Sequence, residues 1–321
     1  MGDKGYNDID MLDEGLDEKP TKNSRPFQDD TASKKRQKTG IDHASQQPHS
    51  NDATTNDATS KMIPGCHIYP PIREHMGTII FLHDQNTTTE ACSRSFFQRS
   101  KDAGCDLRWA LPNHQWIFST SGRRDPSWFD QQQPLAGDSA KEPPAETQAH
   151  RAGVCASLGD LFHIIDAQAN AVGSHNVALV GMGQGAAVAA VAFLTGWHAV
   201  DCFVGMAGWL PCQAQVDQLI CDSKDVVEAQ RRMRDFFPPP EECDMPSWFG
   251  SLGKSVLLVE CADDEVVPHA RSTGLYQVLL DMSMQVQRHV YNMGGHEGVT
   301  ESRAMEEVAR FLIQWDMEHN S

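Results

Sequence analysis

Basic residues are scarce in this sequence: 27 Lys and Arg stand against 44 Asp and Glu, which gives a formal net charge of -17. An acidic chain lacks the electrostatic footprint of a nucleic-acid binder, and 24 Gly with 17 Pro are too few for a collagen-like protein. CxxC pairs are absent, the nine cysteines are an odd number, and no charged, apolar leader opens the chain. We therefore expect free thiols in a reducing compartment such as the cytoplasm, and neither a disulfide scaffold nor a secreted protein.

Large apolar side chains are also sparse in residues 1–65, which contain the near-repeat Asn51–Thr54 and Asn56–Thr59. Such a segment cannot bury enough surface to offset its ordering entropy, so we predict a disordered tail over 1–65. The basic cluster Lys34–Lys38 within it is typical either of a nuclear import signal or of a solvated charge run. The predicted location is cytoplasmic, with nuclear entry through an import receptor as the alternative.

Residues 66–321 are enough for one large domain, and short apolar runs alternate in them with helix-period segments. Leu158, Leu161, Phe162 and Ile165 share one helix face, as do Met305, Val308, Leu312 and Trp315. The runs, which are typical of strands covered on both faces, lie at 78–82, 177–180, 202–206 and 256–259, with a further strand-like segment at 285–291. This alternation predicts a mostly parallel sheet with helices on both sides.

Two segments, 212–253 and 177–195, differ from this simple alternation. Residues 212–253 are rich in charge, contain three consecutive prolines at 238–240, and are predicted to form an excursion or lid-like insertion outside the sheet. Val177–Thr195 carries no charge and is long enough to cross a bilayer, but Gly181, Gly183 and Gly185 interrupt it. A buried strand, a tight turn and a buried helix explain this pattern better than a transmembrane segment.

The turn at 181–186 fits two unlike functions. In the nucleophile elbow G-x-S-x-G a strained strand-to-helix turn presents a serine, whereas here its centre is Gly183. In the dinucleotide fingerprint G-x-G-x-x-G/A the backbone approaches a pyrophosphate, and Gly181, Gly183 and Ala186 satisfy that pattern. The acid expected at the end of the next strand is missing, because Asp201 precedes that strand.

Downstream residues favour the hydrolase interpretation. A hydrolase of this type needs an acid and then a histidine, each on a loop after a later strand. Asp264 and its neighbour Asp263 follow the run at 256–259, and the family resemblance given below favours Asp264; His296 follows the segment at 285–291. We therefore predict that Asp264 and His296 are hydrogen-bonded partners.

On these residues the sequence resembles the acyl-protein thioesterases and their carboxylesterase/lysophospholipase relatives in the α/β-hydrolase superfamily, over roughly 77–315. The motifs that carry the resemblance are Thr78–His83, Pro126–Asp130 (P-S-W-F-D), Gly181–Gly185, Gly208–Pro211 (with W-L-P), Asp264–Pro268 (D-x-x-V-P) and Gly295–His296. The resemblance implies the α/β-hydrolase fold and oxyanion amides at Gln85 and Gln184. It also implies substrate contacts from Trp128, Phe129, Met182 and Trp209. Core packing is an equal alternative for Trp128 and Phe129, and it is the interpretation favoured for Met182.

Two parts of the family pattern are altered. Gly183 stands where the family has its serine, and His83–Thr87 reads H-D-Q-N-T where the family has H-G-L-G-D. A glycine has no oxygen with which to form an acyl-enzyme. We therefore expect an impaired or inactive pseudo-hydrolase, and we expect Gly183→Ser to raise esterase activity by orders of magnitude if the scaffold is intact.

The partners expected are an acylated protein or a small acyl ester or thioester, with no nucleic acid and no membrane span. One alternative is a working hydrolase in which His296 and Asp264 activate water; another is dinucleotide binding at 181–186. No cofactor is expected, and no metal, because H-E-x-x-H and closely spaced His/Cys sets are missing. A second P-S-W-F at 246–249 offers Trp248 and Phe249 as an apolar patch for a partner or lid.

Overall fold

The computed structural model describes residues 66–320 apart from 122–126, 131–143, 197–199 and 239–252. The described residues all belong to one compact unit, Asp52–Ser321. The predicted tail at 1–65, with its basic cluster, lies outside the described residues, as does the second P-S-W-F motif. Pro126 of the first P-S-W-F-D motif does too.

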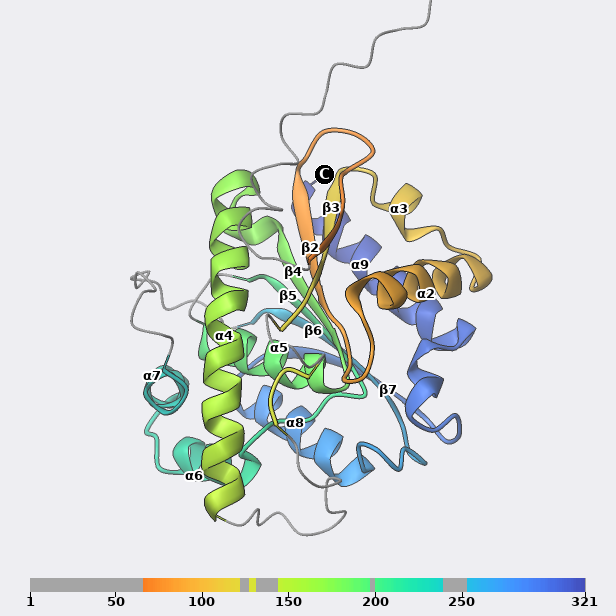
Figure 1. Cartoon of the computed structure of the whole chain (residues 1–321). Coiled ribbons are helices and arrows are strands. Elements are labelled where there is room, and N and C mark those ends of the chain that lie inside the picture. Colours follow the sequence, from red (N-terminus) through yellow and green to blue (C-terminus); the bar gives the residue numbers. More distant parts are fainter. Residues whose placement is uncertain (1–65, 122–126, 131–143, 197–199, 239–252, 321) are drawn as a thin grey trace, which may run out of the picture. The chain divides into compact units, whose positions relative to one another are not determined.

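The centre of the described unit is a seven-stranded sheet with the order β1-β3-β2-β4-β5-β6-β7 (Figure 1). Only the pairing of β1 with β3 is antiparallel; the other strand pairs are parallel. The strands are β1 (His67–Tyr69), β2 (Gly77–Leu82), β3 (His114–Ser119), β4 (Val177–Met182), β5 (Cys202–Met206), β6 (Ser255–Cys261) and β7 (Gln285–Tyr291). This is the predicted α/β-hydrolase architecture, with two strands, β1 and β3, that the sequence analysis did not identify.

Helices cover both faces of the sheet, which explains why its central strands are wholly apolar. On one face lie α2 (Thr89–Asp102) and α9 (Ser302–Asn320), and on the other α4 (Pro144–Val172), α5 (Gln184–Thr195) and α8 (His269–Asp281). Successive residues of β2 divide between the two layers: Ile79 packs with the α2 and α9 side chains, and Ile80 with those of α4 and α5. The shorter helices are α3 (Leu107–Ala110), η1 (Ser174–Asn176), α6 (Gln213–Cys221), α7 (Val226–Phe236) and η2 (His296–Thr300).

The segment that resembled a membrane span is a strand, a turn and a helix inside the core. β4 ends at Met182, Gly183 forms the turn, and every residue of α5 is buried. In the described part of the chain no helix is both long and apolar enough to cross a bilayer. The predicted excursion at 212–253 contains α6 and α7, and its remaining stretch at 239–252 is outside the described residues.

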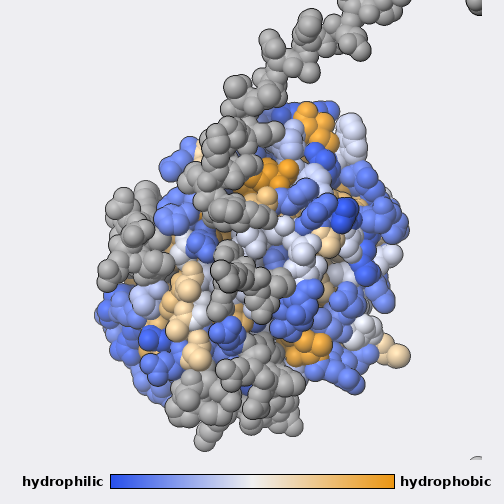
Figure 2. All heavy atoms as spheres, in the orientation of Figure 1, coloured by the Kyte–Doolittle hydropathy of each residue, from blue (hydrophilic) through white to orange (hydrophobic). Residues whose placement is uncertain are grey.

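Polar side chains dominate the face of the molecule drawn in Figure 2, and the apolar ones that can be seen form separate small groups. Among the described residues, this face therefore offers no large apolar patch for a ligand, and a binding site is expected in a hollow of the surface. Because β2 to β7 run parallel, the loops that follow them gather at one edge of the sheet, where ligands of open α/β sheets bind.

Candidate active site

The residues of the candidate site lie directly after the carboxyl ends of four strands. The loop after β2 carries Asp84, the turn after β4 is Gly183, the loop after β6 carries Asp264, and the segment after β7 carries His296. The parallel register explains why residues more than two hundred positions apart meet here.

The predicted pairing of the acid and the histidine is present. His296 Nδ1 lies 2.8 Å from Asp264 Oδ2, and both side chains are largely shielded from solvent. The other oxygen of Asp264 accepts hydrogen bonds of 2.8 Å from the backbone N–H groups of Val266 and Val267, which fix its orientation. Asp263 instead accepts from the N–H groups of Gly294 and Gly295 and so ties the β6 loop to the β7 loop.

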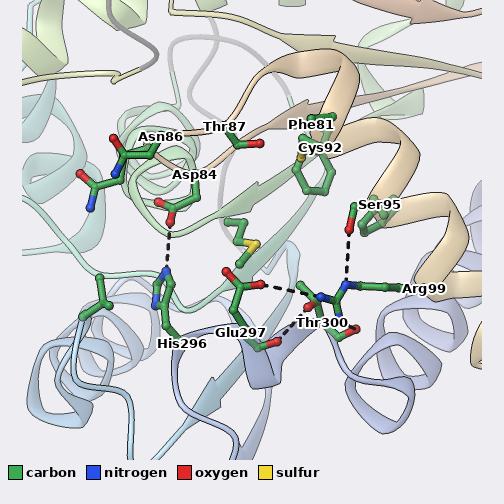
Figure 3. A pocket seen from close by; sticks show the side chains of 15 residues that line it. Phe81, Asp84, Asn86, Thr87, Cys92, Ser95, Arg99, His296, Glu297 and Thr300 are labelled. Atoms are coloured by element: carbon green, nitrogen blue, oxygen red, sulfur yellow. Dashed lines mark hydrogen bonds and ion pairs between the residues drawn. The ribbon is translucent and has the colours of Figure 1, made fainter.

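The second nitrogen of His296 has a partner that the sequence analysis missed. Its Nε2 lies 3.0 Å from Oδ2 of Asp84 (Figure 3). The other oxygen of Asp84, Oδ1, accepts a 2.8 Å hydrogen bond from the backbone N–H of Gln184, the first residue of α5. One carboxylate thus bridges the imidazole and the positive N-terminus of a buried helix.

Gly183 has the backbone conformation of a strained elbow, with φ 52 and ψ -120. A Cβ built on Gly183 would lie 2.0 Å from Asp84 Oδ1 and 2.3 Å from Asp84 Cγ. The carboxylate of Asp84 therefore fills the space that any side chain at position 183 needs. The side chain of Asp84 would have to turn aside before a hydroxyl at position 183 could act, so we now expect Gly183→Ser alone to give no gain, and this stays a prediction.

The charge state of His296 follows from its two partners. Burial lowers the pKa of His296, but the hydrogen bonds and negative charges of Asp264 and Asp84 outweigh that effect and raise it to about 10. The ring is therefore an imidazolium at neutral pH, with both N–H groups donating to carboxylates. A protonated imidazole cannot accept a proton from water, so the water-activation alternative lacks its base near pH 7.

We expect NMR titration of His296 to give a pKa near 10 that falls in Asp84→Asn, because one of the two charges that raise it is removed. Asp263→Asn is the matched control, since Asp263 contacts backbone amides and not the imidazole. A pKa raised on folding stabilises the protein fully below the unfolded value of about 6.5, and this contribution is lost as the pH rises through the folded value. An ordinary, unshifted titration of His296 in the wild-type protein would contradict the bridging arrangement.

The two predicted oxyanion residues have different surroundings. The N–H of Gln184 already donates to Asp84, so it is occupied, and Gln85 lines the cavity described below. The buried side chain of Gln184 accepts a 2.6 Å hydrogen bond from the N–H of Trp128 and donates to the carbonyl of Phe129. Gln184 thereby anchors the 128–129 segment to the start of α5.

Three of the four predicted substrate contacts lie in the core. Trp128, Phe129 and Trp209 have relative exposures of 0%, 1% and 4%, and none of the three lines the cavity. Trp128 donates from its indole nitrogen to the carbonyl of His83, so it supports the loop that carries Asp84. This burial favours the core-packing alternative for Trp128 and Phe129 and gives Trp209 a packing role as well, whereas Met182 is half-buried and lines the cavity.

A cavity of about 410 Å³ opens beside His296. Its apolar wall includes Phe81, Phe96 and Met182, and its polar wall includes Asp84, Arg99 and Glu297. The full lining is Phe81, Asp84, Gln85, Asn86, Thr87, Ala91, Cys92, Ser95, Phe96, Arg99, Met182, Val266, His296, Glu297 and Thr300. Within the described residues, no group of three or more His, Cys, Asp or Glu side chains is placed to hold a metal ion.

The thiol of Cys92 and the hydroxyl of Ser95, which line the cavity, are not activated in the way a nucleophile requires. Burial, reinforced by the charges of Asp84 and Glu297, raises the pKa of the Cys92 thiol to about 12, so the thiolate is scarce at neutral pH. Ser95 Oγ accepts a 3.4 Å hydrogen bond from Arg99 Nε. Both nitrogens of His296 are taken by carboxylates, so the imidazole is not paired with either group.

Comparison with known proteins agrees with the fold described above. The model of the phospholipase/carboxylesterase family matches residues 64–234. No curated protein matched the sequence. Similar solved structures include esterase PE8 (TM-score 0.53, 16% identity, 77% of this chain and 97% of that one), SOBER1 of Arabidopsis thaliana (0.53, 16%, 74% and 98%) and acyl-protein thioesterase 2 of Zea mays (0.50, 20%, 78% and 98%). At these identities the structural likeness shows the fold.

Proposed function

Since the chain belongs to the phospholipase/carboxylesterase family, we propose that it is a member that binds esters or thioesters in its cavity without serine-dependent acyl transfer. The single observation that carries this proposal is the occupation of the elbow: Asp84 Oδ1 lies 2.0 Å from where a Cβ on Gly183 would be. Gly183 then stands in the nucleophile position of the family, and the carboxylate of Asp84 replaces the missing hydroxyl as the partner of His296.

The occupied oxyanion amide supports the same proposal. Acyl transfer needs N–H donors free to receive the oxygen that becomes negative in the transition state. The N–H of Gln184 already donates to a full negative charge on Asp84. A substrate carbonyl would have to displace that carboxylate, and removing one such donor typically costs about 10²–10³ in turnover.

The size and lining of the cavity support the proposal that the protein binds a small ligand there. Its volume of about 410 Å³ lies within the range of small-molecule sites, and Phe81, Phe96 and Met182 provide apolar surface for an acyl chain. Arg99 is held by long contacts, 3.4 Å to the carbonyl of Thr300 and 3.9 Å to Glu297. Together with its 3.4 Å hydrogen bond to Ser95 these contacts are all long, and they hold the guanidinium at the cavity wall, where it can meet a ligand oxygen.

Dinucleotide binding at 181–186 fits the geometry less well. A pyrophosphate would need the N-terminus of α5, and the first N–H of that helix is engaged by Asp84. Asp201 lies before β5, at the opposite edge of the sheet from the site.

We expect isothermal titration with p-nitrophenyl butyrate at pH 7 to give saturable binding without release of p-nitrophenolate. Met182→Arg is expected to weaken this binding at least about tenfold, because a long cation fills the apolar wall at a cost of about 1.4 kcal/mol or more. Met317→Arg is the matched control, since Met317 is exposed on α9 and does not line the cavity.

Two results would contradict the proposal. One is covalent labelling of any cavity side chain by a fluorophosphonate probe, which would reveal an activated hydroxyl or thiol. The other is turnover of the ester at rates typical of esterases, about 1–10³ per second.

A further inference from the structure

Asp84 blocks the space beside Gly183, but its carboxylate is also positioned as a nucleophile would be. Its carboxylate lines the cavity and keeps 17% of its side-chain surface exposed. Both oxygens are oriented, Oδ1 by the N–H of Gln184 and Oδ2 by His296 Nε2, while the remaining lone pairs face neither partner. A carboxylate positioned in this way belongs to the side chains that form covalent intermediates in enzymes.

The nature of a carboxylate decides which carbon it could attack productively. With the carbonyl carbon of an ester or thioester it would form a tetrahedral adduct, which reverts because the carboxylate is a better leaving group than an alkoxide or a thiolate. With a saturated carbon it forms an alkyl ester, which persists until water cleaves it. The chemistry available to Asp84 is therefore substitution at a saturated carbon.

Because His296 is protonated, it can donate a proton to the leaving group, and this determines which leaving groups the site favours. The imidazolium is the proton donor nearest to Asp84, 3.0 Å from Oδ2, and it suits a leaving atom that becomes a basic oxygen. A strained three-membered cyclic ether supplies such an oxygen, and an apolar substituent on it would meet Phe81, Phe96 and Met182.

We propose that Asp84 is a nucleophile that opens epoxides with apolar substituents in this cavity, and that His296 and Gln184 complete their hydrolysis to diols. The inference rests on the proposed function only in placing the ligand in the same cavity. It adds a reaction at saturated carbon to a site in which acyl transfer is absent.

The first step forms one bond and breaks one. An oxygen of Asp84 attacks a ring carbon, the carbon–oxygen bond of the epoxide breaks, and its electron pair stays on the ring oxygen. That oxygen takes the Nε2 proton of His296. The products are a hydroxyalkyl ester on Asp84 and a neutral imidazole.

The second step restores the site. Esterification removes the negative charge of Asp84, one of the causes that raise the pKa of His296, so the ring can then act as a base. The imidazole takes a proton from water as the water oxygen attacks Cγ of Asp84, and the N–H of Gln184 donates to the oxygen that becomes negative. The ester bond breaks, the diol leaves with the former carboxylate oxygen and takes a proton, and the carboxylate and imidazolium are regenerated.

A single-turnover experiment in ¹⁸O-water tests this route directly. The full chain, in excess over styrene oxide or 1,2-epoxyhexane, is digested and the peptide that contains Asp84 is analysed by mass spectrometry. We expect one heavy oxygen in Asp84 and none in the first diol formed. Asp84→Asn should lose diol formation at least about 10³-fold, since no carboxylate remains to attack.

The matched control is Asp102→Asn, the same chemical change on the exposed end of α2, which should leave labelling and turnover unchanged. His296→Gln should lose turnover, and any ester that forms should persist on Asp84. Heavy oxygen in the diol instead of in Asp84, or no labelling and no diol with either epoxide at millimolar concentration, would overturn the proposal. These readouts are independent of p-nitrophenolate release and fluorophosphonate labelling, so either proposal can fail alone.

Discussion

Asp84→Gly combined with Gly183→Ser is expected to hydrolyse p-nitrophenyl butyrate at least about 10³-fold faster than the wild-type protein, because removal of a triad serine costs up to about 10⁶ in turnover. The double variant empties the space beside residue 183 and places a hydroxyl there, within reach of His296 Nε2. It also frees the N–H of Gln184 and removes one charge that keeps His296 protonated. The gain is measured by steady-state kinetics with the chromogenic ester, together with fluorophosphonate labelling of the introduced hydroxyl, followed by intact mass.

The single variants are the controls for this prediction. Gly183→Ser alone should show no gain, because its Cβ collides with the carboxylate of Asp84. Asp84→Gly alone should show none either, because it has no hydroxyl to acylate. A large gain in Gly183→Ser alone would mean that Asp84 leaves the elbow easily, and no gain in the double variant would mean that the loop at 83–87 cannot form an oxyanion hole.

Gly185→Ala is expected to lower the free energy of unfolding by about 3 kcal/mol, the upper end of the usual cost of overpacking. An added Cβ would lie 2.3 Å from the carbonyl oxygen of Leu82 and 2.4 Å from that of His83. Both contacts are backbone, so α5 would have to move away from the end of β2. Urea denaturation followed by circular dichroism measures the change.

Gly274→Ala is the matched control, since Gly274 also lies inside a helix, α8. Its added Cβ would meet the side-chain oxygen of Gln213 at 2.9 Å, which is the far end of a flexible chain that can turn aside. Alanine also favours the helix over glycine by about 1 kcal/mol. Equal stability losses in the two variants would contradict the claim that backbone contact at Gly185 is the cause.

The inner strands could be predicted because they are covered on both faces and are therefore mostly continuous apolar runs, whereas the edge strand β7 is part-exposed and largely polar. β3 escaped prediction because it begins with His114 and Gln115, which are polar but buried. Gln115 is accommodated by a 3.0 Å hydrogen bond to Gln168 on α4, a partner fifty-three residues away. Such a compensation cannot be seen in a local pattern.

The site was predictable where chain order alone determines position. Asp264 and His296 each follow a strand, and parallel strands bring their loops together. Asp84 was missed because the altered loop at 83–87 was evident in the sequence but the direction of its carboxylate was not. The sequence left Trp128 and Phe129 open between a pocket wall and the core, because an aromatic residue in a family motif suits both. Only the packing of 128–129 against Gln184 and His83 favours the core.

The shared space of Asp84 and Gly183 also constrains how this chain can evolve. A descendant that acquires serine at 183 first incurs a steric conflict with Asp84. One that acquires glycine at 84 first loses one of the two carboxylates that pair with His296, without obtaining a serine hydroxyl. Selection for esterase activity therefore finds no gain at either first step. The two substitutions would have to occur together to give a gain, and selection would meanwhile act on whatever the carboxylate of Asp84 itself contributes.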